Sequence, residues 1–61
     1  MKMKTVFEKE NKNFSMLAKW DTKYKWGFVY VMQNDWMYDV QTVSTKEELI
    51  EIVSEYVTYL F

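Results

Sequence analysis

An alternation of side chains with a period of two, repeated in neighbouring segments, limits this chain to a fold built on a β-sheet. In residues 14–20 one face of the predicted strand carries Phe14, Met16, Ala18 and Trp20, and the other carries Ser15, Leu17 and Lys19. In residues 24–33 one face is aromatic and the other carries Val29 and Val31, so both faces are apolar in the middle of the segment. This pattern is typical of a central strand that is covered on each side.

Two further segments complete the predicted sheet. Residues 2–8 and 36–43 also alternate, and short polar segments at 10–13 and 21–23 predict turns. The dipeptide Asn34–Asp35 predicts a two-residue hairpin, because Asn and Asp tolerate a positive φ. The alternation places Thr5 on the same face as Met3 and Phe7, and it gives the last strand a face made of Trp36, Tyr38, Val40 and Thr42.

The C-terminal segment, residues 45–60, predicts an amphipathic helix. Ser44 or Thr45 can act as the N-cap, and each has a glutamate three residues later, which is the spacing of a capping box. The apolar side chains cover an arc of about 200°, whereas a helix docked on a sheet typically needs a stripe of about 100° or more. Part of the helix surface is therefore expected to be covered by something other than the sheet.

These elements predict one α+β domain over residues 1–61. Its sheet has four antiparallel strands in meander order, because short hairpin links join antiparallel neighbours. The single C-terminal helix then packs on one face of the sheet, which gives the order ββββα. The pattern does not decide which face the helix covers.

Composition indicates that this domain has more apolar surface than it can bury. A chain of this length hides only about 60% of the surface that its unfolded form exposes. Cysteine and histidine are absent, so disulfides and the usual metal ligands cannot support the fold, yet 20% of the residues are aromatic. We therefore expect self-association, with a homodimer as the simplest form.

The same composition argues against catalysis, metal binding and a cofactor. The commonest general base and the commonest thiol nucleophile are His and Cys, which are also the ligands that transition metals favour. The carboxylates of Asp35 and Asp39 can meet only near a hairpin end, where we expect them to be solvated. The sequence thus predicts a protein that is not an enzyme and that has no catalytic, cofactor-binding or metal-binding residues.

Binding to another protein is the favoured function. Trp and Tyr are enriched at the energetic centres of interfaces, although most of these side chains are expected in the core. Residues 1–26 carry a net charge of +4 and residues 27–61 a net charge of −5, a separation suited to guiding two copies together. The interface candidates are Trp20, Trp26, Trp36, Tyr56, Tyr59 and Phe61.

Single-stranded nucleic-acid binding is the alternative function. Residues 25–30 resemble part of the aromatic strand signature of RNA-recognition and cold-shock domains, in which aromatic side chains stack on bases and lysines attract phosphate. Val29 replaces a small residue of that signature, and one helix does not fit the RNA-recognition order. The favoured interpretation instead places these aromatic side chains in the core under the helix. The nucleic-acid candidates are Lys19, Lys23, Lys25 and Trp26.

The cytoplasm is the predicted compartment. The longest apolar run, residues 28–32, is far shorter than the ~20 residues of a membrane-spanning helix. Charged residues interrupt the N-terminal segment where a secretion signal needs its apolar stretch. All eight basic residues are lysines, which hints at a low-GC bacterium or its phage. A phage or mobile-element inhibitor of a host protein, such as a defence enzyme, is the corresponding expectation for function.

Overall fold

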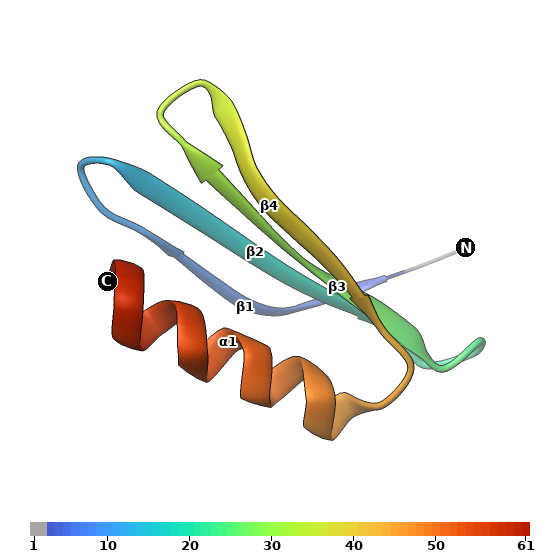
Figure 1. Cartoon of the computed structure of the whole chain (residues 1–61). Helices are drawn as coiled ribbons and strands as arrows, with labels where there is room; N and C mark the ends of the chain where they lie inside the picture. Colours follow the sequence, from blue (N-terminus) through green and yellow to red (C-terminus); the bar gives the residue numbers. More distant parts are fainter. Residues whose placement is uncertain (1–2) are drawn as a thin grey trace.

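The computed structural model describes residues 3–61, and it confirms the predicted ββββα fold (Figure 1). The four strands lie in the order β1-β2-β3-β4, and every neighbouring pair is antiparallel. The helix follows the last strand. The elements are β1 (Lys4–Glu10), β2 (Phe14–Asp21), β3 (Trp26–Gln33), β4 (Trp36–Val43) and α1 (Lys46–Leu60). The prediction for the first strand began at Lys2, which lies outside the described residues.

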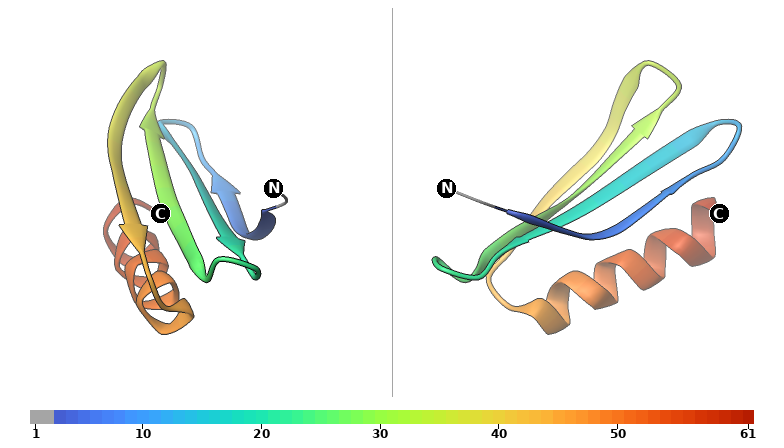
Figure 2. Two further views of the ribbon diagram at one scale, coloured as in Figure 1. Left: turned by 90° about the vertical axis from the view of Figure 1, so that its right-hand side faces the viewer. Right: turned by 180° about the vertical axis from the view of Figure 1, so that it is seen from behind.

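The molecule has two layers, the sheet and the single helix. Helix α1 crosses one face of the sheet and contacts β2, β3 and β4, whereas no described element covers the other face (Figure 2). The radius of gyration is 11.2 Å, compared with about 10.5 Å for a compact domain of this length. The molecule is therefore less compact than an average domain of its length, as expected of a sheet with one face uncovered.

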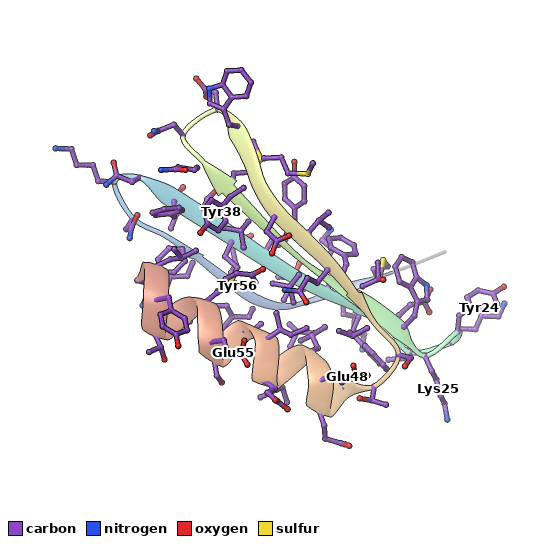
Figure 3. The ribbon with its side chains drawn as sticks, viewed as in Figure 1. Tyr24, Lys25, Tyr38, Glu48, Glu55 and Tyr56 are labelled. Atoms are coloured by element: carbon purple, nitrogen blue, oxygen red, sulfur yellow. The ribbon has the colours of Figure 1, made fainter. Side chains whose placement is uncertain are left out.

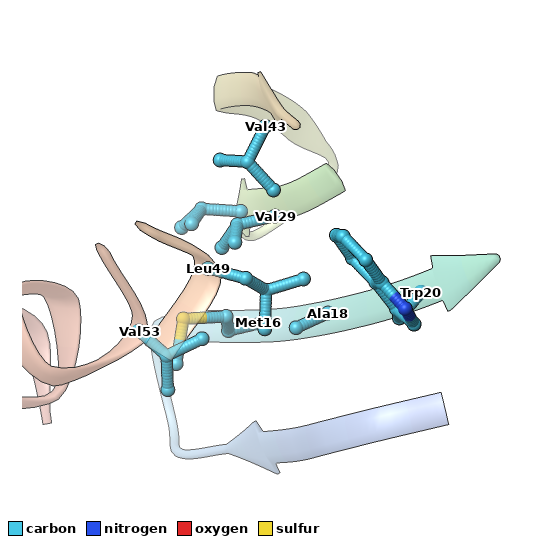
Figure 4. Packing of buried hydrophobic residues seen from close by; sticks show 8 residues of the cluster. Met16, Ala18, Trp20, Val29, Val43, Leu49 and Val53 are labelled. Carbon is cyan, nitrogen blue, oxygen red and sulfur yellow. The ribbon is translucent and has the colours of Figure 1, made fainter. Parts of the chain in front are cut away.

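The core lies between the helix and the small side chains of the central strands (Figure 4). Gly27 lets the helix approach closely, because a Cβ placed there would lie 2.9 Å from the Leu49 Cδ1 and 2.8 Å from the Trp20 Cε3. Ala18 and Val29 are fully buried beside it. The buried apolar residues are Met16, Ala18, Trp20, Val29, Val31, Val43, Leu49 and Val53.

The aromatic side chains of β3 are not part of this core, so the expectation that they lie under the helix was wrong. Val29 and Val31 are buried on the helix side, whereas Phe28 and Tyr30 are half-buried on the opposite face. On β3 the helix docks over the face with the small side chains, where Gly27 leaves room for the Trp20 ring and Leu49. The second apolar face that the sequence predicted is thus left uncovered.

Each edge strand contains a bulge, which changes the predicted facing of its side chains. In β1 the pairing skips Val6, so Val6 and Phe7 both line the helix side, and Thr5 faces the opposite way. In β4 the pairing skips Tyr38, which packs edge-on against the Phe14 ring at 5.4 Å. The predicted groupings of Thr5 with Phe7, and of Tyr38 with Val40 and Thr42, were therefore wrong.

Side chains of Asp and Asn fix the turns. The β2–β3 connection spans residues 22–25, longer than predicted, because Asp21 accepts hydrogen bonds from the amides of Lys23 and Tyr24 at 2.8 and 3.1 Å. Asp21 is itself buried, and its second carboxylate oxygen has no partner within the described part of the chain. The two-residue Asn34–Asp35 hairpin is confirmed, with Asn34 at φ 56°.

Both ends of the helix are fixed by polar contacts. Thr45 is the N-cap, and its hydroxyl oxygen accepts the Glu48 amide at 3.2 Å, which confirms one of the two predicted caps. At the other end, the Asn11 side chain donates to the Leu60 carbonyl at 3.0 Å. The β1–β2 turn is therefore tied to the C-terminus of the helix, while the β3–β4 hairpin projects beyond it (Figure 1).

Candidate interaction surface

The uncovered side of the sheet is a continuous apolar surface, here named the open face. Its centre is a row of large side chains along β3 with Leu17 of β2 beside it. The Trp26 and Phe28 rings lie 6.2 Å apart and form a ridge at one end of this row. By the pairing register, the open face consists of Thr5, Glu8, Glu10, Ser15, Leu17, Lys19, Trp26, Phe28, Tyr30, Met32, Met37, Val40 and Thr42, with the buried Asp21 beside Trp26 at its end.

The register arranges these residues in rows that run across the strands. The first row joins one side chain from each strand, and it has threonines at both edges: Thr5, Lys19, Phe28 and Thr42. The next row is Glu8, Leu17, Tyr30 and Val40. The last complete row, at the far end from the ridge, is Glu10, Ser15, Met32 and Met37.

A hollow of about 500 Å³ lies at the end of the open face opposite the ridge. Leu17, Tyr30 and Met32 give it an apolar lining, and Glu8 and Glu10 lie along its β1 side. Lys19 is on the other side of the face centre, in the same row as Phe28 of the ridge. One end of the open face thus has the large rings and the lysine, and the other end has the hollow and the two glutamates.

A second apolar feature lies on the helix side, between β1 and α1. This groove has a volume of about 560 Å³ and is lined mainly by apolar side chains, with Lys9 and Ser54 as its polar residues. Ile50 borders it and is 53% exposed. The sequence predicted that the sheet leaves part of the apolar surface of the helix uncovered. The helix residues that line this groove are part of that uncovered surface.

The predicted interface residues do not come together on one surface. Trp20 and Phe61 belong to the core or pack on it, with Trp20 only 8% exposed. Trp26 is on the open face, Trp36 is 79% exposed at the β3–β4 hairpin, and Tyr59 is 82% exposed on the helix. Of the six candidates, only Trp26 belongs to the open face.

The central residues of the open face were missed as site candidates. Phe28, Tyr30 and Leu17 are ordinary core residues by composition, and the favoured interpretation left them there. A signal was present in the sequence, because the alternation sets Gly27 and Val29 on one face of β3 and the aromatic side chains on the other. A helix is expected to dock on the face with the smaller side chains.

The nucleic-acid candidates lie at the ridge end of the sheet but do not share one face. Lys19 is beside Phe28 on the open face. Lys23 lies in the β2–β3 turn, with its Nζ 5.3 Å from the centre of the Tyr24 ring. Tyr24 and Lys25 project from that turn in different directions (Figure 3). Of the three candidate lysines, Lys19 is therefore on the open face, and Lys23 and Lys25 are in the β2–β3 turn.

A polar cluster joins β4 to the helix. The Tyr56 hydroxyl donates a hydrogen bond to an Asp39 carboxylate oxygen, and the Gln41 amide donates to the Tyr56 oxygen at 2.9 Å. Asp39 is half-buried, so the expectation of a solvated carboxylate was wrong for this residue, whereas Asp35 is exposed as expected. Burial raises the pKa of Tyr56 above its usual 10.0, and the bond to Asp39 adds to this rise.

Replacing Tyr56 with phenylalanine is expected to cost about 1 kcal/mol at neutral pH, because a half-buried carboxylate loses its donor. The raised pKa also makes the wild type lose stability above pH 10, where the unfolded tyrosine ionises while the folded one keeps its proton. Urea unfolding between pH 7 and pH 11 checks both effects. The Tyr56→Phe variant should lose less stability over the alkaline range, and the matched Tyr59→Phe change on the exposed helix face should alter neither.

Two absences hold for residues 3–61. No group of three or more Asp and Glu side chains gathers there as a metal ion requires. Over the same residues, α1 is too short and too polar to pass through a lipid bilayer. Comparison with protein families, curated proteins and solved structures finds no match to this chain.

Proposed function

We propose that this chain is a protein-interaction module that binds through the open face of its sheet. The observation that carries the proposal is the uncovered β3 row, in which Trp26, Phe28 and Tyr30 stand side by side with no described element over them. Contiguous exposed apolar patches on small proteins mark binding sites. Aromatic side chains with polar groups around them are the usual composition of an interface centre.

The surroundings of the row suit a protein better than an anion. Val40 and Met37 extend the apolar area across β4, with exposed fractions of 45% and 60%. Glu8 and Glu10 provide a negatively charged edge along β1. A polar rim around an apolar centre is the anatomy of a protein interface.

The test compares the centre of the open face with the helix-side groove. Tyr30→Asp places a charge in the middle of the open face, and Ile50→Asp places the same charge at the exposed edge of the groove. We expect Tyr30→Asp to weaken binding to the chain's protein partner about 100-fold, since an unpaired charge is forced into the interface. Ile50→Asp should leave binding unchanged.

The measurement has two parts. Sedimentation equilibrium reports association of the chain with itself, and isothermal titration reports binding to any protein that co-purifies from the native cells. Far-UV circular dichroism shows whether both variants keep the fold. If Tyr30→Asp binds the same proteins as the wild type with the same affinity, the open face is not the binding surface.

Single-stranded nucleic acid is the second candidate, because Lys19 lies next to Phe28 and Trp26 in the manner of a stacking platform. This function predicts binding of a labelled oligonucleotide that falls steeply with salt and disappears in Trp26→Ala. The protein-binding proposal predicts no such binding at physiological salt. The carboxylates of Glu8 and Glu10 beside the hollow would repel a phosphate backbone, which favours binding to a protein.

The cytoplasm, the phage or mobile-element origin and a host defence enzyme as target stay predictions from composition. The proposed interaction surface does not depend on them.

A further inference from the structure

We infer that the open face binds a second copy of this chain, with the strands of the two sheets antiparallel across the interface. In this arrangement the Trp26–Phe28 ridge of each copy sits in the hollow of the other. The inference rests on the proposed function, and it names the partner of the same surface. Its three supports are the size of the face, the position of the hollow and the position of the charges.

The open face is large enough for a stable pair. Four strands of seven or eight residues cover roughly 26 by 19 Å, on the order of 500 Å² on each partner, so two such faces reach the ~1,000 Å² that a specific interface needs. A second copy brings a face of the same outline and the same apolar row. The two faces therefore cover each other completely, as two packed sheets do.

Two identical chains that pair face to face are related by a two-fold axis, which can run either across the strands or along them. The shape of the open face favours the first of these directions. The ridge lies at one end of β3, and the hollow lined by Tyr30 and Met32 lies toward the other end. An axis running across the strands turns the partner end for end and brings each ridge over a hollow. An axis running along the strands would instead place each ridge over the Lys19 end of the partner's β2 and leave both hollows empty, which forfeits packing contacts.

The charges select the same direction. With the axis across the strands, between the row of Lys19 and the row of Glu8, Lys19 lies over the partner's Leu17, and the partner's Glu8 is next to that leucine in the same row. With the axis along the strands, Lys19 would lie over the partner's Phe28, next to the partner's Lys19, so two like charges would be close together with no carboxylate in that row. Removing a charge from water without a partner costs several kcal/mol.

Pairing through the sheet edges is the competing way to join two copies. Both edge strands are interrupted, at Val6 in β1 and at Tyr38 in β4, where the ladder skips a residue. Bulges of this kind block strand addition at sheet edges. The face, rather than either edge, is therefore the surface that a second copy can use.

Crosslinking tests the geometry, and the absence of cysteine makes each introduced thiol unique. Thr5 and Thr42 lie in one row at opposite edges of the face, about 14 Å apart because neighbouring strands are about 4.8 Å apart. A bismaleimide that spans about 10 Å, the usual spacing of packed sheets, reports which edges meet. The variants are Thr5→Cys and Thr42→Cys, alone and mixed.

We expect each cysteine variant to crosslink to itself, and the mixture to give no additional product that joins the two variants. A product joining Thr5→Cys to Thr42→Cys, with neither variant linked to itself, would show the other axis and overturn the inference. Ile50→Cys, in the helix-side groove, is the control, and it should not crosslink. Efficient linking of Ile50→Cys alone would show association through the groove and would also overturn the inference.

Sedimentation equilibrium with a matched pair of tryptophan variants tests the ridge. Trp26→Ala removes the ridge and is expected to weaken the dimer about 30-fold or more, as the loss of a central aromatic anchor does. Trp36→Ala truncates an exposed tryptophan outside the open face and should leave the dissociation constant unchanged. Equal effects of the two changes would contradict a ridge in the interface.

The inference and the proposed function fail in different ways. A wild-type chain that remains a monomer at millimolar concentration overturns the second copy as partner. Binding of a different protein, lost in Tyr30→Asp and kept in Ile50→Asp, would still support the proposed function. If neither the chain itself nor another protein binds through the open face, both are wrong.

Discussion

Truncating Leu49 to alanine is expected to remove 2–5 kcal/mol from the free energy of unfolding, the range for a fully buried leucine. Leu49 is 0% exposed and fills the space between the helix and Gly27. A domain of this length has a total stability of about 3–9 kcal/mol. The variant should therefore be largely unfolded at 37 °C, with loss of the cooperative transition in urea.

The neighbouring residue supplies the control for this prediction. Ile50→Ala removes a side chain of the same size from the same turn of the helix, but this side chain is 53% exposed. Its cost should stay below about 1 kcal/mol, since surface truncations far from the core have small effects. Both variants are measured by urea unfolding at one protein concentration, because association stabilises the folded state. Similar losses for the two variants would mean that Leu49 is not the centre of the core.

Adding one methyl group at Gly27 is expected to destabilise the fold by up to about 3 kcal/mol, the upper part of the usual range for overpacking. The new Cβ would lie 2.4 Å from the Lys19 carbonyl oxygen, which belongs to the backbone and cannot move without disturbing β2. The Trp20 ring and the Leu49 methyl group press on it from the other directions. Thermal unfolding should show a lower midpoint for Gly27→Ala than for the wild type.

Strand propensity alone predicts the opposite sign, which makes this variant informative. Alanine is preferred to glycine in strands, so Gly27→Ala should stabilise a strand in which nothing approaches the backbone. Thr42→Ala, on the exposed side of β4, tests propensity without any close contact and should cost less than about 1 kcal/mol. A Gly27→Ala variant more stable than the wild type would show that the helix does not pack closely over β3.

Local patterns were sufficient to predict the elements and their order. The alternation in residues 14–33 depends on which side chains are apolar, and every hairpin link is short, so strands and topology follow together. The helix start was predictable because Thr45 and Glu48 have the spacing of a capping box. These signals lie within a few residues of each other, and tertiary contacts do not alter them.

The facing of the edge strands could not be predicted from alternation. One extra residue in a strand reverses the orientation of everything beyond it, and neither Val6 nor Tyr38 differs from its neighbours in a way that marks a bulge. The contact between Asp39 and Tyr56 was also missed, because the two residues are 17 positions apart and meet only after the helix docks. The centre of the open face was predictable from the alternation in β3, but the bulges at Val6 and Tyr38 decide which edge residues join it.

The bulged edges also limit how far assembly can proceed. Sheet proteins with long, regular borders can add strand after strand and grow into filaments. Here β1 and β4 each interrupt their outer hydrogen-bonding row, while the broad apolar area lies at right angles to it. In the proposed dimer, two molecules that hide this area against each other leave no equivalent site for a third, so we expect a finite complex rather than a filament.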